Sequence, residues 1–260
     1  MAKVIAVTNQ KGGVGKTTTA TALATGLNRE GYKTLLADLD PQINSTDTYR
    51  ALVSGQATLY DVLVKGDPIT EAIQHTEIGD IVAGDPLLAD AEQKISEQGR
   101  EYRLKEAMES LPDAYDFVII DTPPNIGVLL TNALTAADSC IIPITPERYS
   151  FQGLGELDKS IARVRKYSNP NLEIDGLLLV KTNPRTKLAK SAMQDMPAIC
   201  DSLGTKCFNS FIRVAEDVKK AQERRVSLFS WAPDSTAAQD YEAFIDEYLR
   251  DNMLQKEEEE

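Results

Sequence analysis

Cysteine and histidine are rare in this sequence, and their scarcity limits the sites that it can build. Cys140, Cys200, Cys207 and His75 are the complete set, and they show no Cys-x-x-Cys spacing. A structural zinc ion takes about four such ligands, so neither structural zinc nor a framework of disulfides is expected. We expect a protein of a reducing compartment, with Cys140 as a small buried hydrophobic residue and His75 as a surface residue.

Long apolar runs and an excess of positive charge are also missing. No run approaches the ~18 residues that a membrane-spanning helix needs, and the N-terminus turns polar too early for a signal peptide. The chain has 28 Lys and Arg against 40 Asp and Glu, which gives a net charge of −12. This balance excludes a basic coat over the whole surface but leaves room for a local basic patch. We therefore expect a soluble protein.

Short β-branched runs alternate with longer helical patterns along most of the chain. Several runs are apolar at nearly every position, as in Phe117-Val-Ile-Ile, which is typical of a parallel strand buried on both faces. Apolar stripes of helical period occupy residues 20–27, 154–164 and 237–248, and residues 56–73 have the pattern of an amphipathic helix. This alternation predicts an α/β fold, a doubly wound and mostly parallel sheet flanked by helices. Strands are expected at residues 3–8, 33–38, 80–83, 116–121, 139–144 and 174–181.

A glycine-rich segment stands between the first expected strand and the first expected helix. Residues 10–18 are Gln-Lys-Gly-Gly-Val-Gly-Lys-Thr-Thr. Glycines let successive backbone N–H groups converge on phosphate oxygens, and the following helix points its positive end at the same place. Lys16 would reach the β- and γ-phosphates, and the Thr17 hydroxyl would coordinate Mg²⁺. The strict pattern has glycine where Gln10 stands, so the segment is a deviant phosphate loop.

The version that begins Lys-Gly-Gly-x-Gly-Lys-Thr resembles the deviant Walker A family of P-loop ATPases, which includes the ParA/Soj partition proteins and the MinD division-site proteins. The resemblance implies that Lys11 is the signature lysine, which crosses a dimer interface to touch the partner's nucleotide. It also implies ATP and Mg²⁺ as cofactors. The residues expected to bind the nucleotide within the loop are Gly12, Gly13, Val14, Gly15, Lys16, Thr17 and Thr18.

Acidic residues follow two of the expected strands. Asp38-Leu-Asp40-Pro-Gln ends the second strand, and Asp121-Thr-Pro-Pro follows the run at 117–120, so these carboxylates emerge at the edge where open α/β sheets bind ligands. By resemblance, Asp40 orients or activates the attacking water and completes a catalytic set with Lys11 and Lys16. Thr17, Asp38 and Asp121 would hold Mg²⁺, and the stretch after Asp121 would sense the γ-phosphate. The family usually continues Pro-Gln-Gly-Asn, whereas Ile43 replaces that glycine here, with an effect on the loop that the sequence leaves open.

Four further segments, at residues 132–139, 142–144, 149–157 and 211–222, look like ParA/Soj partition ATPases specifically. The resemblance covers nearly the whole chain and implies a single P-loop ATPase domain over residues 1–250. The helix-turn-helix domain that precedes the loop in longer partition proteins is not expected, and residues 251–260 are expected to be a disordered acidic tail. By similarity, Asn183 and the loop that contains Pro233 would flank the adenine.

The basic residues are concentrated in one late segment, because residues 181–225 hold ten Lys and Arg but five Asp and Glu. Phosphate contacts from such a patch would bind double-stranded DNA without sequence preference and in a salt-sensitive way. The alternative for each residue is an ordinary solvated helix face. Arg213 is the favoured contact, because the resemblance is closest around it. The expected DNA-binding residues are Lys187, Lys190, Arg213, Lys219, Lys220 and Arg224.

These observations favour an ATP-dependent DNA-partition switch in the cytoplasm, associated with the nucleoid. The ATP-bound homodimer would bind DNA, and a ParB-like centromere-binding protein would stimulate a weak ATPase and release it. One alternative is a ParA-like positioning ATPase for another cargo. A second is a MinD-like ATPase that cycles on membranes; such a protein needs a C-terminal basic helix, and this acidic C-terminus argues against a membrane partner. A third is a nitrogenase-reductase type of electron carrier, for which no cysteine stands in a matching context.

Overall fold

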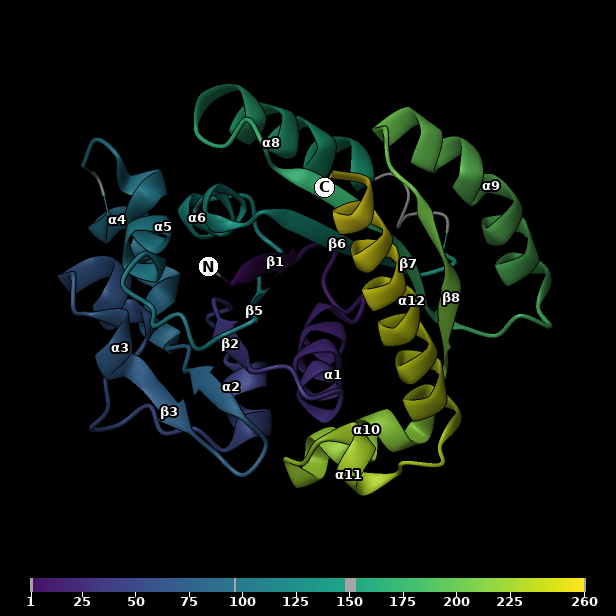
Figure 1. The fold of residues 1–260 in the computed structure, drawn as a ribbon, viewed down its shortest axis with the longest axis horizontal. Coiled ribbons are helices and arrows are strands. Elements are labelled where there is room, and N and C mark those ends of the chain that lie inside the picture. The colour runs from purple at the N-terminus through teal and green to yellow at the C-terminus, as the bar shows by residue number, and fades with distance from the viewer. Residues whose placement is uncertain (1, 96, 148–152, 260) are drawn as a thin grey trace.

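The computed structural model describes residues 2–95, 97–147 and 153–259, without the side chains of residue 92 and residues 253–259. In these residues the strands form an eight-stranded sheet in the order β3-β4-β2-β5-β1-β6-β7-β8 (Figure 1). All neighbouring pairs are parallel except β3 with β4. The strands are β1 Lys3–Val7, β2 Thr34–Asp38, β3 Ile73–His75, β4 Asp80–Val82, β5 Phe117–Asp121, β6 Ser139–Ile144, β7 Glu173–Thr182 and β8 Cys207–Arg213. The predicted fold class is confirmed.

Helices cover both faces of the sheet, and each face has its own apolar core. Within the described residues, one face packs against α1 Lys16–Arg29, α2 Asn44–Tyr49, α10 Glu216–Arg224, α11 Leu228–Trp231 and α12 Thr236–Glu259. The other face packs against η1 Asp61–Lys65, α3 Ile69–Ala72, η2 Pro86–Asp90, α4 Ala91–Lys94, α5 Arg103–Met108, α6 Val128–Ala136, α8 Leu154–Tyr167 and α9 Lys187–Leu203. The short helix η3 Arg100–Tyr102 contacts α6. No helix in the part of the chain that the structure describes is both long and apolar enough to cross a bilayer.

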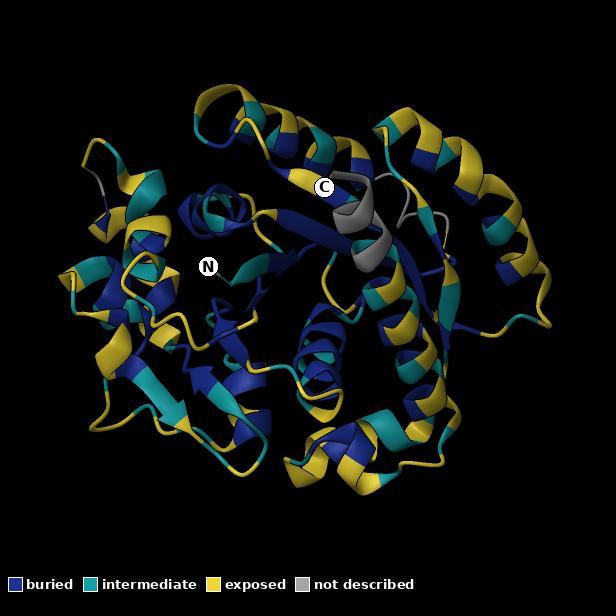
Figure 2. Cartoon of the chain, in the orientation of Figure 1, coloured by how far each residue is buried: buried dark blue, intermediate teal, exposed yellow. Residues whose placement is uncertain are grey.

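The central strands are apolar at nearly every position because both of their faces are covered. In β5, Val118 and Ile120 enter one core while Ile119 enters the other, as the two-residue period of a strand requires. All five residues of β2 and of β5 are buried, and Figure 2 shows the middle of the sheet as continuously buried. The side-chain pattern therefore places the sheet between two helix layers.

Three of the helices predicted from apolar stripes are present as α1, α8 and α12. The amphipathic helix predicted over residues 56–73 is wrong. A short helical segment ends at Gly66, which has φ +81°, and Pro68 precedes the separate turn α3. A left-handed glycine ends a helix and a proline cannot continue one, so the period alone was misleading here. The strands β3 and β8 were not predicted.

The cysteines correct one expectation. Cys200 on α9 and Cys207 on β8 form a disulfide with their Cα atoms 6.0 Å apart, where the sequence had led us to expect no disulfide framework. Their spacing gave no sign of it, because the turn between α9 and β8 brings them together. Cys140 is buried and His75 is exposed, as expected, although the His75 ring lies 2.6 Å from Asp80.

Two expectations concern residues with little or no description. Helix α12 continues to Glu259 through the acidic end of the chain. The side chains expected to form a disordered tail lie mostly outside the described residues, so that expectation stays a prediction. The partition-like segment at 149–157 begins in residues 148–152, which also lie outside them.

The strand register determines where the site lies. Val7 at the end of β1 stands opposite Asp121 at the end of β5, and Asp121 stands opposite Asp38 at the end of β2. The loops that follow these three strands therefore begin at one level of the sheet. Because β1 connects through α1 to β2 while β6 lies on its other side, this level is the switch point at which doubly wound sheets bind ligands.

Candidate active site

The glycine-rich loop connects β1 to α1 at this edge. Gly13 and Gly15 have φ of +73° and +94°, values that glycine adopts without a steric penalty. A Cβ added to Gly12 or Gly13 would meet no atom within 4 Å, so this face of the loop is open. Helix α1 begins directly after Gly15 without a side-chain cap, which leaves its first N–H groups available to an anion. The loop has the form of a phosphate cradle.

Lys16 lies at the base of the loop and is only 6% exposed. Its ammonium is 3.4 Å from the backbone oxygen of Lys11. Burial lowers the pKa of Lys16, while the charges of Asp121 and Asp40 act in the opposite direction. A buried ammonium between a glycine-rich loop and two carboxylates is placed to bind the phosphate oxygens of a ligand.

Asp38 and Asp121 form a buried pair at the ends of adjacent strands. Both side chains are fully buried, and this burial raises the pKa of each carboxyl above its usual range. For Asp121 the neighbouring Asp38 raises the pKa further. Asp38 Oδ2 accepts hydrogen bonds from the backbone N–H and the hydroxyl of Thr46 at 2.8 and 2.7 Å. These hydrogen bonds orient the Asp38 carboxylate. They do not neutralise the charge of the buried pair, so a bound cation would stabilise it.

The donor set at this pair suits magnesium. Asp121 Oδ2 accepts from the Ser45 hydroxyl at 2.8 Å, while its Oδ1 is buried and has no partner among the described residues. The Thr17 hydroxyl is close enough to lower the pKa of Asp121. Mg²⁺ prefers oxygen ligands from one or two carboxylates together with hydroxyl, water and phosphate oxygens. Thr17, Asp38 and Asp121 therefore fit the ion that the sequence predicted for them.

Comparison with known proteins agrees with this geometry. A protein-family model described as an AAA domain matches residues 2–174. The sporulation initiation inhibitor protein Soj of Bacillus subtilis is 40% identical over 200 residues, which are 75% of this chain and 79% of that protein. The chromosome-partitioning ATPase Soj of Treponema pallidum is 34% identical over 252 residues, 96% of this chain and 98% of that protein. The chain belongs to the ParA/Soj family of P-loop ATPases.

A solved structure that contains a bound nucleotide analogue is also similar to this chain. Cobyrinic acid a,c-diamide synthase from Mycobacterium smegmatis, with bound ATP analog and magnesium, has a TM-score of 0.79 and 31% identity to this chain. The match covers 96% of this chain and 95% of the synthase. This chain therefore shares its fold with a protein whose structure was solved with a nucleotide and magnesium.

Lys11, which the sequence predicted as the lysine that crosses a dimer interface, is half-buried. The Lys11 ammonium forms an ion pair with Glu147, and its backbone N–H donates to Asn9 Oδ1 at 2.9 Å. The Asn9 amide in turn donates to the backbone oxygen of Pro143 at 2.8 Å. Sequence analysis did not single out Asn9 or Glu147, because the only signal for either was its position after a strand end.

Asp40 borders a cavity of about 480 Å³ between the loops that follow β2 and β5, which Pro123 and Pro124 also line. Asp40 as a whole is 7% exposed, and its Oδ1 accepts a hydrogen bond from the backbone N–H of Gln42 at 3.0 Å. This cavity is large enough for several waters. The role of Asp40 in orienting a water stays a prediction.

Ile43 adopts a left-handed backbone conformation, which glycine adopts more readily. Its φ and ψ are +51° and +30°, a left-handed conformation that costs a β-branched residue energy. Its N–H donates to the backbone oxygen of Asp40 at 2.9 Å, which keeps the turn closed. The sequence left the effect of this substitution open; the loop keeps a glycine-like turn at the expense of local strain.

Gly84 packs directly behind Asp38, and this close approach leads to a stability prediction. A Cβ on Gly84 would lie 2.8 Å from the backbone oxygen of Asp38 and 3.1 Å from its Cγ. Because backbone cannot move aside cheaply, we expect Gly84→Ala to lower the free energy of unfolding by about 1–3 kcal/mol. Gly155→Ala is the matched control: that glycine lies in α8 with no atom within 4 Å, so alanine should raise the free energy of unfolding by about 0.5–1 kcal/mol. Urea unfolding of both variants tests this, and equal effects of the two substitutions would contradict it.

The two residues predicted to flank the adenine are both exposed. Asn183 follows β7, and its Oδ1 accepts the backbone N–H of Arg185 at 3.1 Å. Pro233 follows α11, where the Arg224 guanidinium lies 4.5 Å from the centre of the Trp231 ring. Their roles at the adenine stay predictions.

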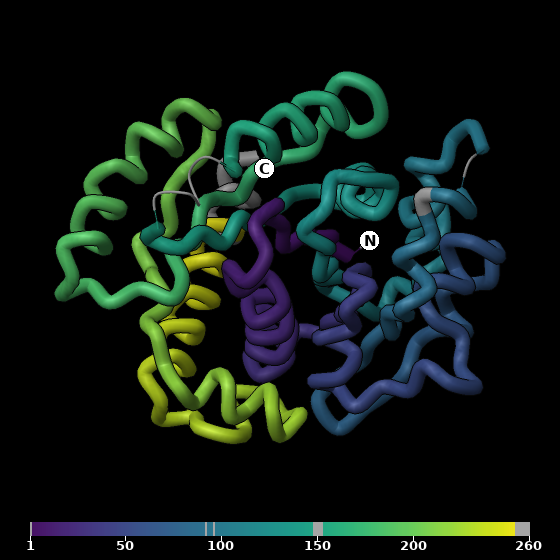
Figure 3. The backbone as a smooth tube through the Cα atoms, turned by 180° about the vertical axis from the view of Figure 1, so that it is seen from behind, coloured from purple at the N-terminus to yellow at the C-terminus, as the bar shows by residue number. Residues whose placement is uncertain are grey.

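The six predicted DNA contacts do not lie on one element. Lys187 and Lys190 are exposed on α9, whereas Lys219 and Lys220 are on α10, 3.5 and 3.8 Å from Glu216 and Asp217. Figures 1 and 3 show α9 and α10 at different sides of the molecule. The basic segment is therefore continuous in sequence but divided in space. The remaining two are Arg213 at the end of β8 and Arg224 at the end of α10.

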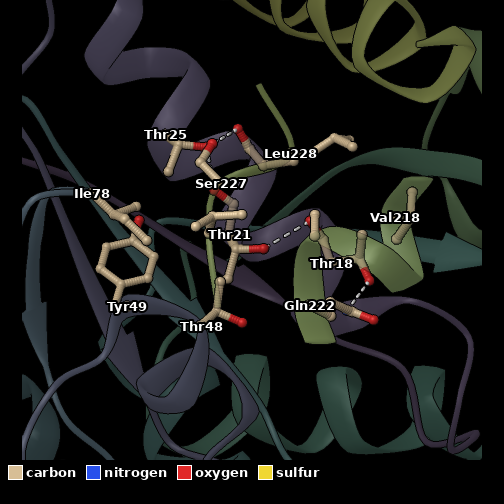
Figure 4. Close-up of a pocket in the computed structure, with 13 residues that line it drawn as sticks. Thr18, Thr21, Thr25, Thr48, Tyr49, Ile78, Val218, Gln222, Ser227 and Leu228 are labelled. Carbon is tan, nitrogen blue, oxygen red and sulfur yellow. Dashed lines mark hydrogen bonds between the residues drawn. The ribbon is translucent and has the colours of Figure 1, made fainter. Parts of the chain in front are cut away.

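Helix α10 also contacts the phosphate-loop helix, which sequence analysis missed. Gln222 Nε2 donates to the Thr18 hydroxyl at 3.1 Å (Figure 4). Arg50, which follows α2, donates to the backbone oxygens of Arg224 and Arg225 at 3.1 and 3.0 Å. A small cavity of about 20 Å³ lies where α1, α2 and α10 meet. The helix that carries Lys219, Lys220 and Arg224 is thus bonded to the first turn of the helix that begins at the nucleotide loop.

Proposed function

We propose that this ParA/Soj-family chain is an ATP-dependent DNA-partition switch. The observation that supports this proposal most is that the buried Lys16 lies beside an open glycine-rich loop and the Asp38–Asp121 pair. Together these groups suit a nucleoside triphosphate with Mg²⁺. Its relative in Treponema pallidum, named as a chromosome-partitioning ATPase, supports DNA as the cargo. The synthase supports the fold and the cofactors, but its identity to the chain is lower than that of the Bacillus Soj protein, so we follow the partition relatives.

The residues of the site divide the work of hydrolysis. The loop N–H groups and Lys16 bind the phosphates, and Thr17, Asp38 and Asp121 hold the ion. Bound Mg²⁺ supplies positive charge to the phosphate oxygens. Asp40, which lines the cavity between the loops that follow β2 and β5, orients the attacking water.

ATP binding would join two copies through Lys11, which must exchange Glu147 for the partner's nucleotide. The dimer would bind DNA without sequence preference through its basic residues, and a ParB-like protein would stimulate the slow hydrolysis that releases it. This cycle places the protein in the cytoplasm and on the nucleoid. ATP drives the cycle only through its different affinity for the two states, and the Gln222–Thr18 hydrogen bond gives α10 a direct contact with the nucleotide helix.

Binding to random duplex DNA with ATP, ADP or a non-hydrolysable ATP analogue, over a salt series, tests this function. Binding that requires the triphosphate and weakens steeply with salt supports the switch. If the protein binds DNA with none of these nucleotides, DNA is excluded as the surface on which the protein acts. If the protein then co-sediments with anionic liposomes in the presence of ATP, the MinD-like alternative is favoured. If it does not, a positioning ATPase for a different cargo is favoured.

Arg213 gives the sharpest test of the DNA surface. Its guanidinium makes an ion pair with Asp240 Oδ1 at 2.6 Å and is 37% exposed. If Arg213 contacts phosphate, Arg213→Ala lowers DNA affinity about tenfold or more while ATP affinity stays within threefold, because it removes a charge-assisted hydrogen bond. Fluorescence anisotropy with labelled DNA measures this.

Asp240→Asn is the control for Arg213. It frees the guanidinium from its partner and keeps an acceptor for the Arg213 backbone N–H, which now donates to Asp240 Oδ2 at 2.8 Å. DNA affinity should be unchanged or higher in this variant. Equal losses in both variants would instead assign Arg213 to holding β8 against α12.

A further inference from the structure

Lys181 lies at the end of β7 in an unusual backbone conformation. Its φ is +52°, in the left-handed region that non-glycine residues rarely adopt. The pairing of β7 with β8 shifts register between Leu179 and Thr182, which marks a local irregularity of the strand. Irregularities of this kind redirect a side chain and occur next to active sites.

The redirected side chain contacts the phosphate loop. Lys181 Nζ donates to the backbone oxygen of Gly13 at 2.6 Å. Its Cε is 3.8 Å from the position that a Cβ on Gly15 would occupy. Residues 168 positions apart in sequence are thus joined by a charge-assisted hydrogen bond. Sequence analysis counted this lysine only as part of the basic segment at 181–225.

The hydrogen bond controls the direction of the next N–H group. The described peptide bonds are trans, so the Gly13 oxygen and the Val14 N–H of one peptide unit point in opposite directions. When Lys181 holds the Gly13 oxygen on its side of the loop, the Val14 N–H is turned to the other side. N–H groups that already point into the cradle do not have to be reoriented when an anion binds.

We propose that Lys181 is a positioning residue of the phosphate loop, which holds the Gly13–Val14 peptide in the orientation that binds a nucleoside triphosphate. This role depends on nucleotide binding at the loop but not on DNA binding. It reassigns Lys181 from the basic surface to the nucleotide site. The left-handed backbone of Lys181 is the strain that accompanies this contact.

Three substitutions separate positioning from folding. Lys181→Met removes the ammonium but keeps the chain length, Lys181→Arg keeps a charged donor, and Lys181→Gly removes the side chain while relieving the left-handed backbone. Lys105→Met removes an exposed lysine from α5 and is the charge control. The full-length variants are titrated with a non-hydrolysable ATP analogue and Mg²⁺ by calorimetry, and their melting temperatures are measured without nucleotide.

We expect the Kd for the analogue to rise about tenfold in Lys181→Met and Lys181→Gly, and to stay within threefold of wild type in Lys181→Arg and Lys105→Met. Lys181→Gly should melt at or above the wild-type temperature, so its affinity and stability move in different directions. Unchanged affinity in Lys181→Met overturns the proposal, as does a loss in Lys181→Gly that accompanies a lower melting temperature. Wild-type protein that binds no nucleotide would instead overturn the proposed function itself.

Discussion

Lys16→Met should lower the affinity for ATP about a hundredfold without destabilising the protein. The phosphate oxygens would lose a buried ammonium, and removing one member of a buried charge pair has effects of this size. Burial lowers the pKa of Lys16, so the folded state is a worse environment for its charge than the unfolded state is. Because burial outweighs the attraction of Asp121 and Asp40, replacing Lys16 with an apolar side chain of similar length removes an unfavourable contribution to stability.

Calorimetry with a non-hydrolysable ATP analogue and urea unfolding without nucleotide measure the two effects of Lys16→Met. Lys105→Met again serves as the control, because it removes an exposed lysine on α5. A loss of affinity that is matched by a large loss of stability would show that Lys16 holds the loop together rather than binding the ligand. Retained affinity would remove Lys16 from the site.

Asp40→Asn should lower the rate of ATP hydrolysis about a hundredfold or more while ATP affinity stays within threefold. An amide keeps the acceptor for the Gln42 N–H, which now donates to Asp40 Oδ1 at 3.0 Å, so the loop is preserved. The amide cannot take a proton from water, and the loss of a general base has effects of about 10²–10⁴. In the proposed cycle, the ATP-bound dimer of this variant would also stay on DNA longer.

Asp47→Asn is the matched control for Asp40→Asn. Asp47 is an exposed aspartate on α2 that pairs with Arg225 at 2.8 Å, and its substitution should leave hydrolysis unchanged. Phosphate release under saturating ATP measures the rates. Hydrolysis by Asp40→Asn at the wild-type rate would exclude Asp40 as the residue that activates water, and an equal loss of nucleotide affinity would assign it to binding.

The structure did not support all parts of the sequence analysis equally. The central strands were predicted because burial on both faces leaves a continuous apolar run. Such a run can be recognised without knowing which elements pack against the strand. The edge strand β3 has three residues and the edge strand β8 contains Asn209 and Ser210, so neither carries that signal. The error at residues 56–73 has a different cause, because the backbone requirements of Gly66 and Pro68 outweighed an apolar period.

Some residues of the candidate site could also be predicted from the sequence, and others could not. The glycine-rich loop and the acids at Asp38 and Asp121 are local in sequence, and each is tied to the end of a strand. Their convergence follows from parallel strands in register. Glu147, which pairs with Lys11, and Gln222, which bonds to Thr18, could not be predicted, since each acts through a residue more than a hundred positions away.

The sequence by itself determined the fold class, the phosphate loop and the order of the acidic residues, because these depend on side-chain period and on short motifs within single elements. The tertiary structure decided what the charged residues contact. It divided the basic segment among the phosphate loop at Lys181, the ion pair of Arg213 with Asp240, and the surfaces of α9 and α10. The physical reason is that the energy of a charge depends on its burial and on partners within a few ångströms, and chain topology rather than sequence spacing supplies both.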